Sequence, residues 1–309
     1  SMFRTAQTPY NIVDATPFAR DAVKELADAC HRRGLRVHFY YSLIDWWRED
    51  APRGRTGLGT GRPAEKEDAD AYFDFMKAQL TELLTQYGNV GAIWFDGIWD
   101  QDENPGFDWR LGELYGLIHK LQPGCLIINN HHLARDLPGE NTAGYSGQEI
   151  SRLPLETCQT MNGMWGYKIT DQNYKSAQTL VRYLAGAAGR GANLLLNIGP
   201  QPDGALPAAA LERLDSMGRW LRANGETIYG TQAGPVSPRS WGVTTRRGDK
   251  IYWPDEELFV PVRDERIRRA VRFADKRAVA FSQDKAGVTL RLGEKPAGAD
   301  CIVELTVGQ

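Results

Sequence analysis

The sequence predicts an α/β fold in which helices alternate with parallel strands, followed by a small antiparallel β domain. Two observations support this prediction. Segments with apolar residues at helical spacing alternate with short apolar segments, most of which end in polar residues. Beyond residue 225 this pattern gives way to short alternating segments separated by turn residues. We therefore expect an α/β domain over residues 1–225 and an antiparallel β domain over residues 226–309.

The predicted helices are segments in which apolar residues recur every three or four positions and a glycine follows closely. They are residues 17–33, 67–87, 109–121, 175–188 and 207–223. The predicted strands are short apolar runs between the helices, namely residues 36–42, 91–96, 125–129, 155–159 and 193–198. In such folds the functional residues collect at the carboxyl ends of the strands. Residues 48–68 are charged and rich in Gly, Arg and Pro, which predicts a flexible surface loop.

The composition excludes several classes of function. Hydrophobic residues make up 42% and charged residues 25% of the 309 residues, which is typical of globular proteins. The net charge of -2, with no long basic run, argues against nucleic acid as the main partner. No apolar run is long enough to span a bilayer, and the first residues show no signal-peptide pattern, so no membrane partner is expected. The compartment stays unknown.

The segment that carries the strongest functional signal is residues 90–100, Val-Gly-Ala-Ile-Trp-Phe-Asp-Gly-Ile-Trp-Asp. Its apolar run stops at Asp96, where a charged side chain is costly unless it has a partner or a function. The aromatic residues Trp94, Phe95 and Trp99 flank this carboxylate. They suggest an aromatic-walled pocket, a common way of holding a sugar ring. A strand end with a solvated aspartate is the alternative.

Glycoside cleavage with retention of configuration requires a second carboxyl group, about 5–5.5 Å from the first. The candidates that follow Asp96 are Glu140, Glu149 and Glu156. Glu156 lies in a mostly apolar run, where desolvation favours the protonated, acidic form. Glu149 lies in a polar loop and could equally be a solvated surface residue. The sequence pattern by itself leaves the choice open.

Histidine and tryptophan side chains also stand at or beyond predicted strand ends. His131 and His132 could bind a metal, but no nearby Cys or carboxylate cluster completes a site, so donation to substrate hydroxyls is the better interpretation. Loop histidines with no special role are the remaining alternative. The four widely spaced cysteines match no zinc spacing, and no metal is predicted. The tryptophans could be core residues or sugar platforms; they are Trp46, Trp47, Trp94 and Trp165.

Several ordered motifs together resemble those of the glycoside hydrolase family 29 α-L-fucosidases. The match runs with hardly a gap from Phe3 to about Tyr229. The motifs are Asn11-Ile12-Val13-Asp14-Ala15-Thr16-Pro17-Phe18, Phe39-Tyr40-Tyr41-Ser42, Trp94-Phe95-Asp96-Gly97, Leu155-Glu156-Thr157-Cys158, Trp165-Gly166-Tyr167 and Asn193-Leu194-Leu195-Leu196-Asn197-Ile198-Gly199-Pro200.

The resemblance implies a TIM-type (β/α) barrel, a retaining mechanism and no cofactor. It implies that Asp96 is the nucleophile that forms a covalent fucosyl-enzyme, and that Glu156 is the acid/base, with Glu149 as the substitute. The expected substrate is α-linked L-fucose on an oligosaccharide, a glycoconjugate or an aryl glycoside. The residues expected to line the fucose pocket are Tyr41, Trp46, Trp94, His131 and Trp165.

The sequence also departs from the family pattern. This chain starts just after the family's first strands, one of which carries a His-His pair that grips the sugar, and Leu43 and Trp47 stand where many relatives carry histidine. We therefore expect an incomplete, open barrel of about five parallel strands. Because an open barrel exposes two strand edges, we expect a homo-oligomer that covers the open flank. A catalytically impaired carbohydrate-binding module is the alternative function.

Overall fold

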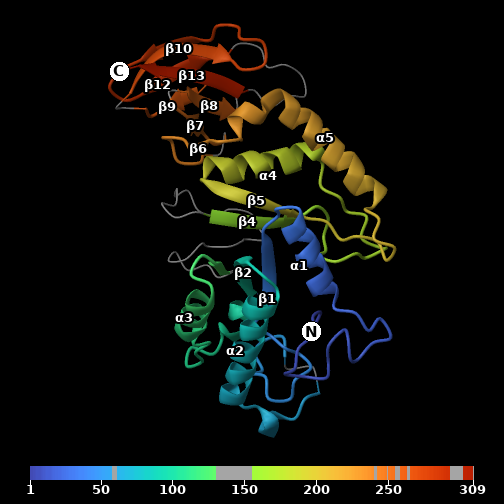
Figure 1. Ribbon diagram of the computed structural model, residues 1–309. Helices are drawn as coiled ribbons and strands as arrows, with labels where there is room; N and C mark the ends of the chain where they lie inside the picture. The colour runs from blue at the N-terminus through green and yellow to red at the C-terminus, as the bar shows by residue number, and fades with distance from the viewer. Residues whose placement is uncertain are drawn as a thin grey trace. The chain divides into compact units, whose positions relative to one another are not determined.

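The computed structural model describes residues 1–57, 61–129, 155–239, 242–248, 250–254, 258–262, 265–292 and 302–308 (Figure 1). The chain forms two compact units, Ser1–Pro138 and Gly139–Gln309, and each is described by itself. In the described part of the chain, no helix is both long enough and apolar enough to cross a membrane.

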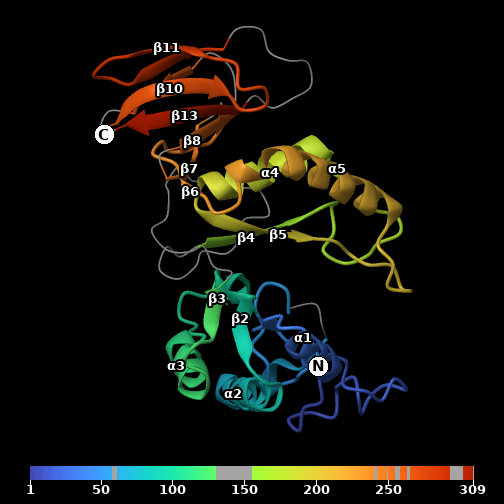
Figure 2. The ribbon, with the colours of Figure 1, turned by 45° about the horizontal axis from the view of Figure 1, so that its top comes forward.

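The first unit contains a three-stranded parallel sheet in the order β1-β2-β3. Its strands are β1 (Val37–Ser42), β2 (Val90–Asp96) and β3 (Leu126–Asn129). The helices α1 (Ala22–Arg32), α2 (Ala69–Gln86) and α3 (Leu111–Leu121) lie beside it (Figures 1 and 2). Ser42 of β1 pairs with Asp96 of β2, and Phe95 pairs with Asn129. The carboxyl ends of the three strands therefore meet at one edge, as predicted.

The core of the first unit lies between α2, α3 and one face of the sheet. The buried face of α2 carries Tyr72, Met76, Leu80 and Leu83, at the helical spacing read from the sequence. These four side chains are at most 3% exposed, and burying each contributes about 1.5–3 kcal/mol. The sheet residues in this cluster include Val37, Tyr41, Val90, Ile93 and Phe95.

The helix starts reflect capping residues that the periodicity alone does not reveal. Asp21 accepts a hydrogen bond from the backbone N–H of Lys24 and caps α1, so the helix begins at Ala22 and not near residue 17. Ser176 caps α4 (Ala177–Gly189) in the same way through the N–H of Thr179. The other helices begin within about two residues of their predicted starts.

The described part of the second unit starts with β4 (Leu155–Thr160), which forms a parallel pair with β5 (Ala192–Asn197), and Glu156 is the register partner of Asn193. Helix α4 packs on β5, and helix α5 (Ala208–Asn224) packs on α4. Their core is formed by Met161, Leu180, Val181, Ala210 and Met217.

The rest of the second unit is antiparallel β structure, drawn in orange and red in Figure 1. One sheet has the order β10-β13-β8-β7-β6 and the other the order β11-β12-β9. Their apolar core includes Val260, Val288, Leu290, Val303 and Leu305. The strands are β6 (Gln232–Ala233), β7 (Thr245–Arg247), β8 (Lys250–Pro254), β9 (Leu258–Val260), β10 (Arg266–Arg272), β11 (Ala280–Gln283), β12 (Val288–Arg291) and β13 (Ile302–Gly308).

The five predicted parallel strands are confirmed as parallel strands close to their predicted bounds. They pair as one group of three and one group of two in the described residues, and no closed barrel is formed. The change from parallel to antiparallel pairing falls between β5 and β6. The predicted boundary at residues 225 and 226 differs from the compact units, which divide after Pro138, and it stays a prediction.

Candidate active site

Asp96 ends β2, and its carboxylate accepts hydrogen bonds from the described residues Tyr40, Gly97 and Trp99. Oδ1 accepts from the backbone N–H of Gly97 at 2.7 Å and from the indole N–H of Trp99 at 2.9 Å. Oδ2 accepts from the phenol of Tyr40 at 2.6 Å. Hydrogen bonds to an ionised group are short and strong, and together they fix the plane of the carboxylate. The carboxylate is therefore oriented, and Asp96 is also half-buried. Both observations argue against a freely solvated strand end.

Gly97 makes this arrangement possible. Its φ of 100° lies in the region that residues with a Cβ rarely adopt, and a Cβ there would lie 2.6 Å from Cγ1 of Ile44. The glycine turns the chain directly from β2 into the short helix η2 (Ile98–Gln101). That turn brings Trp99 back over the carboxylate three residues before it. The Asp-Gly pair in the sequence was the signal for this geometry.

Tyr40 and Trp94 form an aromatic surface next to Asp96. They are register partners on β1 and β2, and their rings stack with centroids 5.6 Å apart and planes 20° apart. Successive residues of a strand point to opposite faces, so Trp94 and Asp96 share a face of β2. Trp94 is thus on the Asp96 face of β2 and stacks on Tyr40, and its expected role in lining a fucose pocket stays a prediction.

The structure corrects the placement of Tyr41. Its side chain is 7% exposed and faces the core, where its phenol donates a hydrogen bond to Oε1 of Gln79 at 3.0 Å. Burial raises the pKa of this phenol, so the group stays neutral. Tyr40 takes the place that was expected for Tyr41, because the two neighbours point to opposite faces of β1. Alternation of Val37, Phe39 and Tyr41 with more polar residues was the available signal.

Asp96 opens on a cavity of about 470 Å³, a volume in the usual range for small-molecule pockets. Asp96, Tyr40 and Trp99 line it together with residues from the end of β1 and the loop that follows. They are Ser42 at the end of β1 and the loop residues Ile44, Asp45, Trp46 and Trp47. Aromatic rings beside a carboxylate suit a sugar, because the rings cover its C–H faces and the carboxylate meets its polar atoms.

The loop after β1 is fastened to the end of β2 by its backbone. The N–H of Leu43 donates to the carbonyl of Asp96 at 2.8 Å. Asp100 is 2% exposed, and its Oδ1 accepts from the N–H of Thr56 at 2.7 Å. The hydroxyl of Thr56 in turn accepts from the indole N–H of Trp46 at 3.0 Å. Asp100 thus positions the Trp46 side of the cavity, a role that the sequence analysis did not assign.

The remaining predicted site residues belong to the second unit or lie outside the described residues. Glu156 is half-buried on β4 of the second unit. Trp165 follows in the same unit, 44% exposed, with its carbonyl accepting from Nδ2 of Asn197 at 2.6 Å. His131 and Glu149, as well as His132 and Glu140, lie outside the described residues. Among the residues that are described, no group of three or more His, Cys, Asp or Glu could hold a metal.

Comparisons with known proteins were made for the whole chain. The α-L-fucosidase of Branchiostoma floridae is 30% identical over 266 residues, which cover 80% of this chain and 56% of that protein. The solved α-L-fucosidase isoenzyme 1 of Paenibacillus thiaminolyticus is 30% identical with a TM-score of 0.77, covering 100% of this chain and 80% of that one. The solved α-L-fucosidase of Vibrio sp. strain EJY3 is 29% identical with a TM-score of 0.82, and the match covers 100% of this chain and 57% of that one.

The matches to curated relatives cover only part of those proteins. This chain spans about half their length, between 51% and 56% for the animal α-L-fucosidases of Rattus norvegicus (tissue form) and Branchiostoma floridae. The model of one protein family, α-L-fucosidase, matches residues 1–226. The first unit with its Asp96 cavity lies within that match. The chain therefore belongs to the α-L-fucosidase family, glycoside hydrolase family 29.

Proposed function

We propose that this protein is a retaining α-L-fucosidase that releases α-linked L-fucose from oligosaccharides or glycoconjugates. The observation that supports it best is the Asp96 carboxylate, held by Tyr40, Trp99 and the N–H of Gly97 at the wall of an aromatic cavity. Membership of the α-L-fucosidase family supports the choice of fucose as the sugar.

In the proposed first step, a carboxylate oxygen of Asp96 attacks the anomeric carbon of fucose. The bond from that carbon to the glycosidic oxygen breaks, and Glu156 donates its proton to the leaving oxygen. In the second step Glu156 takes a proton from water, whose oxygen attacks the same carbon and releases Asp96. Two inversions give net retention, and this mechanism requires carboxyl groups about 5–5.5 Å apart. Glu149 is the substitute for Glu156.

The described donors to Asp96 act mainly in the second step. Asp96 loses its negative charge when the fucosyl ester forms and regains it when the ester is cleaved. The phenol of Tyr40, the indole of Trp99 and the Gly97 N–H then stabilise the departing carboxylate. Because the same groups hold the free carboxylate in a fixed plane, they also aim it for the attack.

Replacing the nucleophile tests the proposal directly. We expect Asp96→Ala to lower kcat/KM on an aryl α-L-fucoside at least a thousandfold, roughly 4 kcal/mol of transition-state stabilisation. Asp102→Asn is the matched control, because Asp102 is an exposed carboxylate that follows η2 and does not line the Asp96 cavity. An Asp96→Ala variant as fast as the parent would refute the assignment.

Trapping distinguishes an enzyme from a sugar-binding module. Incubation of the parent with a slow 2-fluoro-fucosyl donor should add the mass of one 2-deoxy-2-fluoro-fucosyl group, and peptide mapping should place it on Asp96. Saturable fucose binding without any adduct would instead support the alternative, a carbohydrate-binding module without turnover.

For the acid/base, Glu156→Gln should slow hydrolysis more for an alkyl fucoside than for an aryl fucoside with an acidic leaving group. Glu149→Gln should show that pattern if Glu149 is the group.

We also propose that the protein is a homo-oligomer. In the described part of the first unit, β1 and β3 are the outer strands of the sheet, and outer strands tend to be covered. Light scattering should therefore show a mass above that of one chain at micromolar concentration. A stable monomer would refute this part of the proposal.

A further inference from the structure

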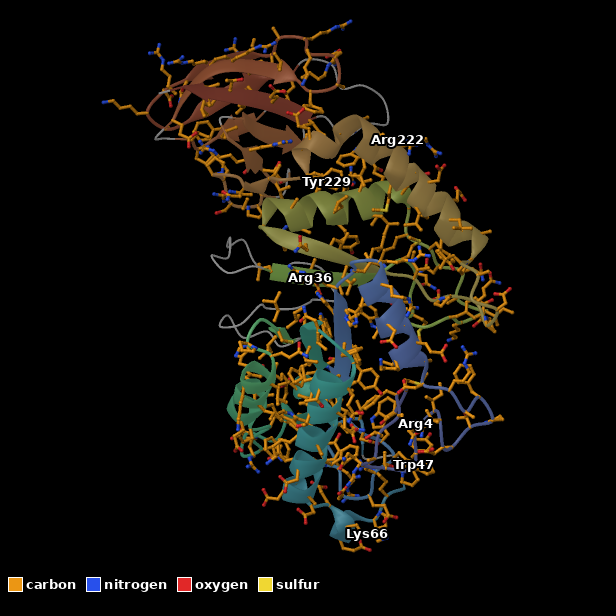
Figure 3. All side chains as sticks on the ribbon, viewed as in Figure 1. Arg4, Arg36, Trp47, Lys66, Arg222 and Tyr229 are labelled. Atoms are coloured by element: carbon orange, nitrogen blue, oxygen red, sulfur yellow. The ribbon has the colours of Figure 1, made fainter. Side chains whose placement is uncertain are left out.

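A second cavity in the first unit, of about 740 Å³, shares Trp46 and Trp47 with the Asp96 cavity. Trp46 and Trp47 thus form a common wall. The second cavity is lined mainly by charged side chains of the connection between β1 and α2, where the sequence predicted a flexible loop. Trp47 and Lys66 mark this end of the first unit in Figure 3.

The two tryptophans are exposed yet fixed in place. Trp46 is 60% exposed and Trp47 is 63% exposed. The indole N–H of Trp46 is bonded to Thr56, and Trp47 stacks on Tyr10 with ring centroids 4.5 Å apart. The carboxylate of Asp45 accepts from the N–H of Trp47 at 2.7 Å. Large apolar surfaces held open to solvent indicate a binding surface, and these need little ordering when a ligand binds.

The connection that forms the rest of the cavity is tied together at several points. Arg48 binds Asp50 through Nε at 2.8 Å, and its guanidinium lies over the ring of Phe75. Arg62 donates to the carbonyl of Ala51 at 3.0 Å. At the more exposed rim, Lys66 pairs with Glu49 at 2.5 Å. The cavity is therefore a built feature of this connection.

The charges of the lining favour a neutral polar ligand. The cations Arg48 and Lys66 are paired with the carboxylates Asp50 and Glu49, and the Arg62 guanidinium donates to the backbone carbonyls of Arg48 and Ala51. An anion would meet two carboxylates, and a wholly apolar ligand would desolvate the ion pairs without replacing their hydrogen bonds. A pyranose satisfies both needs, because its C–H face covers an indole and its hydroxyls bond to charged groups.

We propose that this cavity binds the sugars to which fucose is attached, so that the substrate is a fucosylated oligosaccharide with at least two neutral sugars beyond fucose. This inference rests on the proposed function, in which the Asp96 cavity holds fucose. The second cavity, 740 Å³ against 470 Å³, has room for more than the one ring of the first. The glycosidic bond then lies near Trp46 and Trp47, and the rest of the glycan continues past them.

The test uses the full chain with the double variant Glu49→Ala/Lys66→Ala, which removes the exposed rim of the second cavity. The matched control is Lys24→Ala/Asp28→Ala, which removes an ion pair of similar exposure on α1 of the same unit. Circular dichroism checks that both are folded. Kinetics are measured on an aryl α-L-fucoside and on 2′- and 3-fucosyllactose, and lactose binding is measured by saturation-transfer NMR.

The double variant should lower kcat/KM on at least one fucosyllactose and the affinity for lactose by roughly three- to tenfold, as expected for one or two lost hydrogen bonds. Its activity on the aryl fucoside should stay within twofold of the parent, and the control should match the parent throughout. Equal loss on all substrates, or a parent that cleaves the aryl fucoside and fucosyllactose but does not bind lactose, would overturn the inference. A parent without hydrolysis whose lactose binding depends on Glu49 and Lys66 would overturn the proposed function and leave the sugar site standing.

Discussion

Replacing Gly97 by alanine tests the geometry that sets the Asp96 carboxylate. At a φ of 100° an alanine destabilises the folded state by at least about 1–2 kcal/mol, the usual strain of a left-handed residue. Alanine also restricts the unfolded chain, which offsets about 0.4–1 kcal/mol of this loss. Its Cβ would lie 2.6 Å from Cγ1 and 2.9 Å from Cδ1 of Ile44, and such overpacking adds about 1–3 kcal/mol. We therefore expect a loss of about 2–4 kcal/mol in the free energy of unfolding.

The matched control is Gly34→Ala, which separates backbone strain from the clash. Gly34 has a φ of 70°, and nothing lies within 4 Å of a Cβ built on it. This variant should lose only about 0.5–1.5 kcal/mol. Both losses are measured by urea unfolding monitored by far-UV circular dichroism, and they are compared only if the m-values are the same. If Gly97→Ala is no less stable than Gly34→Ala, the contact with Ile44 does not constrain the turn and the reasoning is wrong.

The clash also has a consequence for activity. Ile44 lines the Asp96 cavity, so its displacement by a Cβ moves the wall and the Trp99 side of the carboxylate. Gly97→Ala should therefore lower kcat/KM on an aryl fucoside by more than tenfold at a temperature where the variant is folded. Gly34→Ala should keep the activity of the parent, because Gly34 lies at the end of α1, outside the cavity lining.

Three further predictions follow from individual hydrogen bonds and buried groups. Tyr40→Phe should lower kcat on an aryl fucoside roughly 5–30-fold, because it removes a partly exposed hydrogen bond to a carboxylate that contributes about 1–2 kcal/mol. The stability of this variant should change little. Tyr41→Phe should do the reverse, with a loss of about 1 kcal/mol of stability and little loss of activity. Burial raises the pKa values of Tyr41 and Tyr72, so these phenols lose their protons at lower pH in the unfolded chain than in the folded protein. Their contribution to the free energy of unfolding is therefore complete below about pH 10 and should fall as the pH rises further. Phenolate absorbance and unfolding should appear together in an alkaline titration. Asp100→Ala should lower the free energy of urea unfolding by about 1–3 kcal/mol, because the Thr56 N–H loses its acceptor. It should also raise KM, because the loop that carries Trp46 becomes less fixed. An unchanged KM would show that Asp100 does not position that loop.

The local order of the fold could be read from the sequence because helices and strands bury side chains at different periods. Met76, Leu80 and Leu83 mark the buried face of α2 without any knowledge of its neighbours. The position of Asp96 at a strand end was also readable, since an apolar run followed by Asp-Gly must leave the core there.

The partner of each side chain was less readable. Alternation along β1 predicts that Tyr41 is buried with Val37, but only the pairing of β1 with β2 places Tyr40 where its phenol reaches Asp96. The loop after β1 carries charged and turn residues that predict mobility. Its backbone is nevertheless held by Asp100, a residue forty or more positions away in the chain.

The sequence by itself determined the alternation of helices and strands, the carboxylate at the end of the second strand and the family to which the chain belongs. Those features depend on periodicity and on ordered motifs, which are local. Only the tertiary structure decided that Tyr40 donates to Asp96, that Trp99 turns back onto it, and that Trp46 and Trp47 are shared by two cavities. These features arise from strand register and from long-range hydrogen bonds, which form only when segments far apart in the chain pack together.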